Sequence, residues 1–218
     1  MNTALKTRND VQLAIAELHR LGLPLHNDPP KNWDGLGALR EVLSHTDTDA
    51  SVLDAGAESY STMLPWLQLY GYTRLFGINL TFTEPWQLGP IRYEYGDLTN
   101  TKYPDHSFDA ITCLSVIEHG VDVDSYFREM RRILKPGGLL VTSTDYFSSH
   151  TPADGLEAYG VPIKVFTEHE LRDLVRSASR SGLELTGEID FRCVDRAVTW
   201  SEVRLSYTFV VFAMQSPR

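Results

Sequence analysis

The sequence contains few cysteines, little positive charge and no long hydrophobic run. Its two cysteines, Cys113 and Cys193, cannot form a disulfide framework, so a reducing compartment is the simpler expectation. The 29 acidic residues outnumber the 20 lysines and arginines and give a net charge of −9, which disfavours non-specific binding to nucleic acid. No apolar stretch approaches the length that spans a membrane, and residues 1–10 lack the apolar run of a secretory signal. We therefore expect a cytoplasmic protein that binds neither nucleic acid nor membranes.

Enough apolar residues are present to build one folded domain with an appendage, since 42% of the 218 residues are hydrophobic. Predicted strands alternate with helical segments from residue 51 onwards. The first strand begins at Ser51, and the others cover 75–80, 91–95, 109–114, 139–143, 183–190 and 207–214. This pattern predicts an α/β fold with a seven-stranded, mostly parallel, doubly wound sheet and helices on both faces. Because no helix is evident between the last two strands, we expect the last strand to be antiparallel.

The segment before residue 51 is predicted to be an N-terminal helical extension and cap (1–50), followed by the main domain (51–218). Apolar residues from Val11 to Leu21 recur at helical spacing. Two prolines then predict an extended chain from His26 to Asp34. Trp33 either anchors this linker on the core or lies near the ligand crevice, if a helix at 36–43 packs antiparallel to the first strand.

The loop after the first strand has the composition of a nucleotide site. Asp54 ends the strand and is followed by Ala55, Gly56 and Ala57, whose small side chains let a ligand approach the backbone. The glycine pattern is incomplete, however, because Glu58 stands where a further glycine is expected.

The order of motifs along the chain resembles that of class I S-adenosylmethionine-dependent methyltransferases. The resembling segments are 52–57, 95–98, 103–109, 115–119 and 130–138. Each is common by chance, but the five occur in the family's order with sensible spacing. The resemblance implies a Rossmann-like fold, S-adenosylmethionine as cofactor and methyl transfer as the activity.

The same resemblance implies a role for each matching residue. The implied cofactor-binding residues are Asp54, Gly56, Ala57, Glu58, Asn79, Asp97, Leu98, Leu114 and Ser115. Gly56 and Ala57 would pass under the methionine part, and Asp54 would help to hold its ammonium group. Asp97 with Leu98 would contact the adenine, and Leu114 and Ser115, at the end of the fourth strand, would wall the cofactor.

Two residues depart from the family pattern. The family usually ends its second strand with an acid that binds both ribose hydroxyls, whereas this chain has Asn79 there. Asparagine lacks the charge-assisted strength of a carboxylate, so weaker cofactor affinity is expected. Glu58 could pair with the ammonium group or point to solvent.

Methyl transfer to a hydroxyl benefits from a base that removes the proton. His119, after the fourth strand, and His150, after the fifth, are the candidate catalytic residues; either could instead have a structural or solvated role. Trp33, Tyr146 and Tyr159 are candidate substrate-binding residues. No metal site is predicted, because the spacing of the available ligands, including Asp145, Asp154 and His169, matches no known pattern.

The predicted function is therefore methyl transfer to a small molecule, with O-methylation of a sugar or secondary metabolite favoured. The alternative is a non-catalytic protein of the same fold that binds the cofactor or a protein partner. A nicotinamide-dependent oxidoreductase is disfavoured by the incomplete glycine pattern and the antiparallel last strand. The sequence indicates neither the acceptor nor the oligomeric state.

Overall fold

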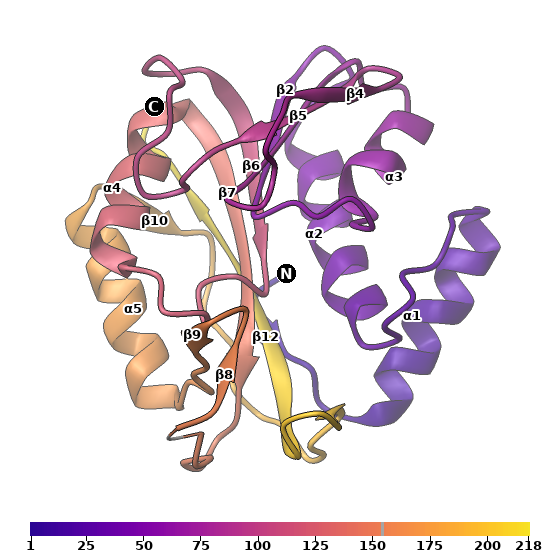
Figure 1. The fold of residues 1–218 in the computed structure, drawn as a ribbon, viewed down its shortest axis with the longest axis vertical. Helices are drawn as coiled ribbons and strands as arrows, with labels where there is room; N and C mark the ends of the chain where they lie inside the picture. Colours follow the sequence, from indigo (N-terminus) through magenta and orange to yellow (C-terminus); the bar gives the residue numbers. More distant parts are fainter. Residues whose placement is uncertain (154) are drawn as a thin grey trace.

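A computed structural model, which describes residues 1–153 and 155–218, contains a large central sheet between two layers of helices (Figure 1). The helices are α1 (Arg8–Leu21), α2 (Lys31–His45), α3 (Met63–Leu69), α4 (Val123–Ile133) and α5 (Glu168–Arg180). The principal strands are β2 (Ser51–Ala55), β3 (Arg74–Asn79), β5 (Ile91–Tyr95), β6 (Phe108–Leu114), β7 (Leu134–Tyr146) and β12 (Leu205–Gln215).

The order of the sheet is β1-β12-β7-β6-β2-β3-β5-β4, where β1 is Thr3–Ala4 and β4 is Trp86–Leu88. Two further strands, β10 (Glu184–Leu185) and β11 (Val198–Trp200), also pair with β12. Neighbours among β7, β6, β2, β3 and β5 are parallel, so their carboxyl ends meet at one edge. β12 runs antiparallel to β7, from Thr208 opposite Tyr146 to Gln215 opposite Leu139. The predicted doubly wound sheet with an antiparallel last strand is thus confirmed.

The sheet has ten strands rather than seven because three short strands extend it. They are β1 (Thr3–Ala4), β4 (Trp86–Leu88) and β11 (Val198–Trp200). Runs of two or three residues are too short to show the alternation by which a strand is predicted. A separate two-stranded hairpin is formed by β8 (Glu157–Ala158) and β9 (Val161–Pro162).

The predicted strand at 183–190 is reduced to β10 (Glu184–Leu185) because the N-terminus takes its place. β10 pairs with β12 at Gln215 and Met214, whereas β1 pairs with the same strand at Val211 and Val210. Asn2 fills the gap between them, since its side-chain oxygen accepts a hydrogen bond from the backbone N–H of Ala213. A long-range pairing of this kind cannot be seen from local sequence.

Each face of the sheet is covered by its own set of helices. α1, α2 and α3 lie on one face and α4 and α5 on the other, as Figure 1 shows from indigo to purple and from pink to orange. Apolar residues of α4 and α5 pack with one face of the strands, and those of α2 and α3 pack with the opposite face. The predicted helices on both faces are confirmed. The division of the chain at residue 50 stays a prediction.

Helix α2 begins at Lys31, five residues before the expected start at Leu36. Pro29 and Pro30 do not prevent this, because proline is tolerated where a helix begins and its carbonyl can still accept hydrogen bonds. The N–H groups of Asn32 and Trp33 donate to the carbonyls of Pro29 and Pro30. The residues at 31–34 are therefore helical rather than extended.

Candidate functional site

The carboxyl edge of the parallel strands brings together the segments that the sequence assigned to a cofactor. Residues 56–58 follow β2, Asn79 ends β3, and Ser115 follows β6. Asp97 comes two residues after β5, whose Tyr95 lies opposite Asn79. The open edge of a parallel sheet is where α/β proteins bind their ligands.

Gly56 allows the chain to turn sharply out of β2. Its φ of +93° lies in the left-handed region, and a Cβ there would overlap the side chain of Val116. The Gly56 N–H donates to the carbonyl of Ile78, 2.8 Å away, so the loop crosses over the end of β3. Ala57 then packs near Gly77, where a Cβ would lie only 3.0 Å from that of Ala57. Small residues are thus required on both strands.

Asp54 is buried at the end of β2 and has one side-chain donor. The Thr112 hydroxyl donates to its Oδ1 over 2.8 Å. Burial raises the pKa of Asp54 to about 6, the nearby Asp34 carboxylate adds to this, and the Thr112 hydrogen bond opposes it. A buried carboxylate with so few donors is ready to accept a cationic or hydrogen-bonding ligand.

Asp34 is a buried acid of the site that sequence reasoning did not identify. It lies on α2, where its Oδ2 accepts hydrogen bonds from Ser143 at 2.6 Å and Ser115 at 3.4 Å. Burial raises its pKa. An acid one helical turn before Ala38, on the buried face of the helix, was the available signal. The two prolines instead predict extended chain at 31–34, and extended chain gives Asp34 no place on a helix face.

Asn79 and Glu58, the two departures from the family pattern, contact each other. The Asn79 side-chain amide donates to Oε1 of Glu58 over 3.1 Å and to the carbonyl of Ala57 over 3.0 Å. Its oxygen accepts from the N–H and the hydroxyl of Thr81 at 2.9 and 3.0 Å. Burial raises the pKa of Glu58, and the Asn79 hydrogen bond opposes that rise.

The remaining cofactor candidates border the same edge. Oδ1 of Asp97 accepts from the N–H and hydroxyl of Thr99 at 2.8 and 2.7 Å, while half-buried Leu98 packs against the core. Leu114 is half-buried at the end of β6. Ser115 has a positive φ of 54°, and its N–H donates to the Ser143 carbonyl at 3.0 Å.

His119 lies beyond β6 between two aromatic side chains. Its ring centre is 5.4 Å from that of Tyr159 and 6.3 Å from that of Trp200. Its Nδ1 is buried without a hydrogen-bond partner among the described residues. Burial lowers the pKa of His119, with a smaller opposing effect from Glu118. The catalytic candidate His119 and the substrate-binding candidate Tyr159 are therefore neighbours, and Trp200 of β11 lies beside them.

Two buried acids, Glu118 and Asp145, interact with each other next to His119. Glu118 accepts a hydrogen bond from the Thr144 hydroxyl at 3.0 Å, and its neighbour Asp145 is hydrogen-bonded by Tyr207. Burial, followed by the charge of Glu118, holds the pKa of Asp145 well above its usual range. Asp145 therefore keeps its proton to a higher pH than an exposed aspartate does.

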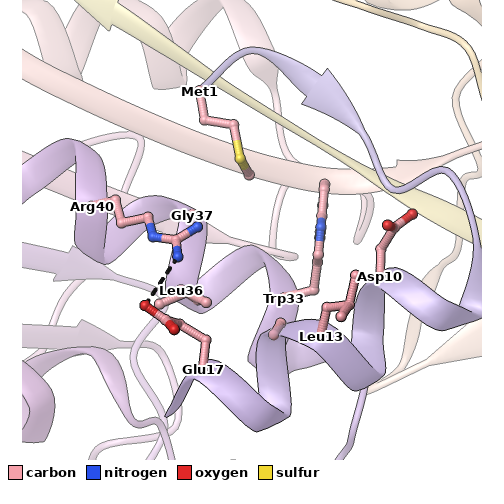
Figure 2. Close-up of a pocket in the computed structure, with 9 residues that line it drawn as sticks. Met1, Asp10, Leu13, Glu17, Trp33, Leu36, Gly37 and Arg40 are labelled. Carbon is pink, nitrogen blue, oxygen red and sulfur yellow. Dashed lines mark hydrogen bonds and ion pairs between the residues drawn. The ribbon is translucent and has the colours of Figure 1, made fainter. Parts of the chain in front are cut away.

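Three predicted site residues lie apart from these groups. Tyr146 is fully buried, and its hydroxyl donates to the Phe191 carbonyl at 2.9 Å on the α5 side. His150 is exposed on the loop after β7. Trp33 lines a cavity of about 310 Å³ between α1 and α2, together with Leu13, Leu36 and others (Figure 2). That cavity includes none of the predicted cofactor-binding residues.

The described part of the chain holds neither a cluster of metal ligands nor a membrane-spanning helix. There, no three His, Cys, Asp or Glu side chains lie close enough to hold a metal ion. Asp154, one of the residues weighed as a ligand, lies outside it. None of the described helices has both the length and the apolar character needed to cross a bilayer.

Residues 53–142 match the family model described as "Methyltransferase domain". Over 81 residues the chain is 38% identical to a demethylmenaquinone methyltransferase of Deinococcus radiodurans, a match that covers 37% of this chain and 31% of that protein. Over 66 residues it is 39% identical to the 27-O-demethylrifamycin SV methyltransferase of Amycolatopsis mediterranei, covering 30% of this chain and 24% of the relative. The matches thus span about a third or less of these curated relatives.

The fold is shared with solved methyltransferase structures. An S-adenosylmethionine-dependent methyltransferase from Mesorhizobium loti superposes with a TM-score of 0.59 at 20% identity, covering 85% of this chain and 97% of the other. Over residues 53–142 the chain therefore matches a methyltransferase domain, and it shares the fold of solved S-adenosylmethionine-dependent methyltransferases. The matched residues run from β2 into β7 and include the predicted cofactor-binding residues from Asp54 to Ser115.

Proposed function

We propose that the protein transfers the methyl group of S-adenosylmethionine to an oxygen of a small metabolite such as a sugar or secondary metabolite. The observation that carries the proposal is the carboxyl edge itself. There, the buried Asp54 lies in β2 with Gly56 just after it, and the half-buried Asp97 follows β5. His119 follows β6 and lies beside two aromatic rings. The name of the Amycolatopsis relative, which denotes an O-demethylated substrate, supports an oxygen acceptor.

The residues present fit the cofactor. The Gly56 turn leaves the backbone accessible where the methionine part would lie, and Asp54 offers a carboxylate for its ammonium group. Oδ2 of Asp97 has no hydrogen-bond partner among the described residues and could accept from the adenine amine. When bound, the sulfonium supplies an electrophilic methyl group, so the protein mainly orients the acceptor and excludes water.

His119 is the proposed base. Its lowered pKa keeps the imidazole neutral at pH 7, and a neutral ring can accept the proton that the acceptor hydroxyl loses. The ring has a buried Nδ1 without a partner among the described residues, and Tyr159 and Trp200 pack against it. Residue 150 remains a second candidate from the flanking loop.

Calorimetry with S-adenosylhomocysteine tests the cofactor, and incubation of the protein and S-adenosylmethionine with a panel of hydroxylated metabolites tests transfer. We expect binding and a methylated product detectable by mass spectrometry. His119→Asn should lower turnover by about 10²–10⁴-fold while leaving cofactor affinity unchanged. The proposal fails if neither binding nor product is detected across the panel.

The second candidate is a non-catalytic member of the fold. The contact between Asn79 and Glu58, in place of the usual acid, is the observation that favours it. This candidate predicts cofactor binding without turnover. It is supported if the protein binds S-adenosylhomocysteine but methylates none of the metabolites in the panel.

A further inference from the structure

We infer that Glu58, rather than the residue ending β3, is the acid that holds the ribose hydroxyls of the cofactor, and that Asn79 positions its carboxylate. This inference rests on the proposed function, because it assumes an adenosyl cofactor at the carboxyl edge. It assigns the ribose contact to a different loop from the one the family uses.

Asn79 has no hydrogen-bonding group left for a ligand. Its two amide hydrogens are donated to the carbonyl of Ala57 and to Oε1 of Glu58, at 3.0 and 3.1 Å. Its oxygen already accepts two hydrogen bonds from Thr81. An amide can offer two donors and two acceptor positions, and all four are occupied. Asn79 therefore acts on the cofactor through its neighbours.

Glu58, by contrast, keeps acceptor capacity. Only Oε1 is engaged, and Oε2 has no hydrogen-bond partner within the described chain. The backbone around it is fixed, since its N–H donates to the Ser61 hydroxyl at 2.9 Å and its carbonyl accepts from the Ser61 N–H at 3.0 Å. The side chain is half-buried, which strengthens hydrogen bonds to its charge.

The path of the loop explains why this carboxylate reaches the end of β3. The hydrogen bond from Gly56 to the Ile78 carbonyl draws the loop across that strand. Gly77 leaves room for Ala57 to pack down on it. Glu58 consequently arrives beside Asn79, at the strand end where an acid is usual. A carboxylate accepts from two adjacent hydroxyls, which is the pattern that a ribose presents.

Two ligands separate a ribose contact from an ammonium contact. S-adenosylhomocysteine carries both groups, whereas 5′-methylthioadenosine has the adenosine but no amino-acid part. The dissociation constants of both should be measured by calorimetry for the native protein and for Glu58→Gln. Glu84→Gln is the matched control, since it makes the same chemical change on an exposed residue of the following loop. Thermal unfolding without ligand checks that each variant is folded.

We expect Glu58→Gln to weaken both ligands by a similar factor of about tenfold or more, because a hydrogen bond to a charged group is lost. Asn79→Asp alone should also weaken both, since two adjacent carboxylates repel each other. The exchange variant, Glu58→Gln with Asn79→Asp, should bind both ligands more tightly than either single variant, which a merely structural Asn79 would not produce.

The contrary outcomes are distinct. If Glu58→Gln weakens S-adenosylhomocysteine alone, Glu58 holds the ammonium group and the inference is overturned. An unchanged affinity for both ligands overturns it as well, and leaves the proposed function standing. If the native protein binds neither ligand, the proposed function itself fails.

Discussion

The Thr112 hydroxyl donates a hydrogen bond of 2.8 Å to the buried carboxylate of Asp54, across the pair of neighbouring strands β2 and β6. Thr112 is also completely buried. A single neutral donor compensates only part of the free energy needed to bury a charge. Without a ligand, the buried charge of Asp54 therefore lowers the free energy of unfolding. A bound cofactor would supply the further hydrogen-bond donors and the positive charge that the carboxylate lacks.

Asp54→Asn should stabilise the unliganded protein at pH 8 and abolish most cofactor affinity. The pKa of Asp54 is raised to about 6 by burial, so its contribution to stability is present at low pH and is lost between about pH 4 and 6. The loss is on the order of 2–3 kcal/mol. The free energy of unfolding of protein and variant should be compared by denaturant titration from pH 4 to 8. A difference that does not grow with pH would contradict this account.

The hydrogen bond itself can be tested by Thr112→Val. The ionised form of Asp54 loses its donor, so the variant should be destabilised by about 1–3 kcal/mol above pH 6 and less below it. Thr142→Val is a matched control, because that buried hydroxyl contacts the neutral Tyr126 hydroxyl at 3.0 Å. Its loss of stability should not vary with pH. Identical pH profiles for the two variants would refute the assignment.

Gly56→Ala should be more harmful than the same change at another left-handed glycine. Both Gly56 and Gly22 have positive φ, but a Cβ at Gly22 meets nothing within 4 Å, whereas one at Gly56 overlaps Val116. We expect a loss of roughly 1 kcal/mol at Gly22 and clearly more at Gly56, with loss of S-adenosylhomocysteine binding only for the latter. If both variants lower the unfolding temperature by the same amount, the turn at Gly56 accommodates a Cβ without additional strain.

Arg196 holds the loop after β7 in place through contacts with three of its neighbours. Removing this side chain should increase the mobility of the loop. The guanidinium lies 3.7 Å from the ring centre of Phe147 and donates to the Thr151 hydroxyl at 2.8 Å and the Ser206 carbonyl at 2.6 Å. In Arg196→Ala, amide hydrogen exchange at 147–151 should accelerate while cofactor affinity is retained.

Arg92→Ala provides the comparison for that experiment. Arg92 is exposed and pairs with Glu94 on β5, which is separated from β7 by three strands of the sheet. Its removal should leave exchange in the loop unchanged. If both variants accelerate exchange equally, Arg196 has no particular hold on the loop.

The sequence by itself determined the alternation of strands and helices, because apolar periodicity and turn residues are local properties. It also indicated the cofactor edge, since parallel strands place their carboxyl ends together and the residues that follow them can be read off in order. Gly56, Asp54, Asn79 and Asp97 were found in this way.

Only the tertiary structure decided what these residues contact. The N-terminal strand at Thr3 takes the place of most of the predicted strand 183–190. Asp34 belongs to helix α2, whose first residues follow two prolines that predict extended chain. The partnership of Asn79 with Glu58 joins residues 21 positions apart, because the loop after β2 crosses β3. Such contacts depend on three-dimensional packing between segments, about which neither composition nor spacing carries information.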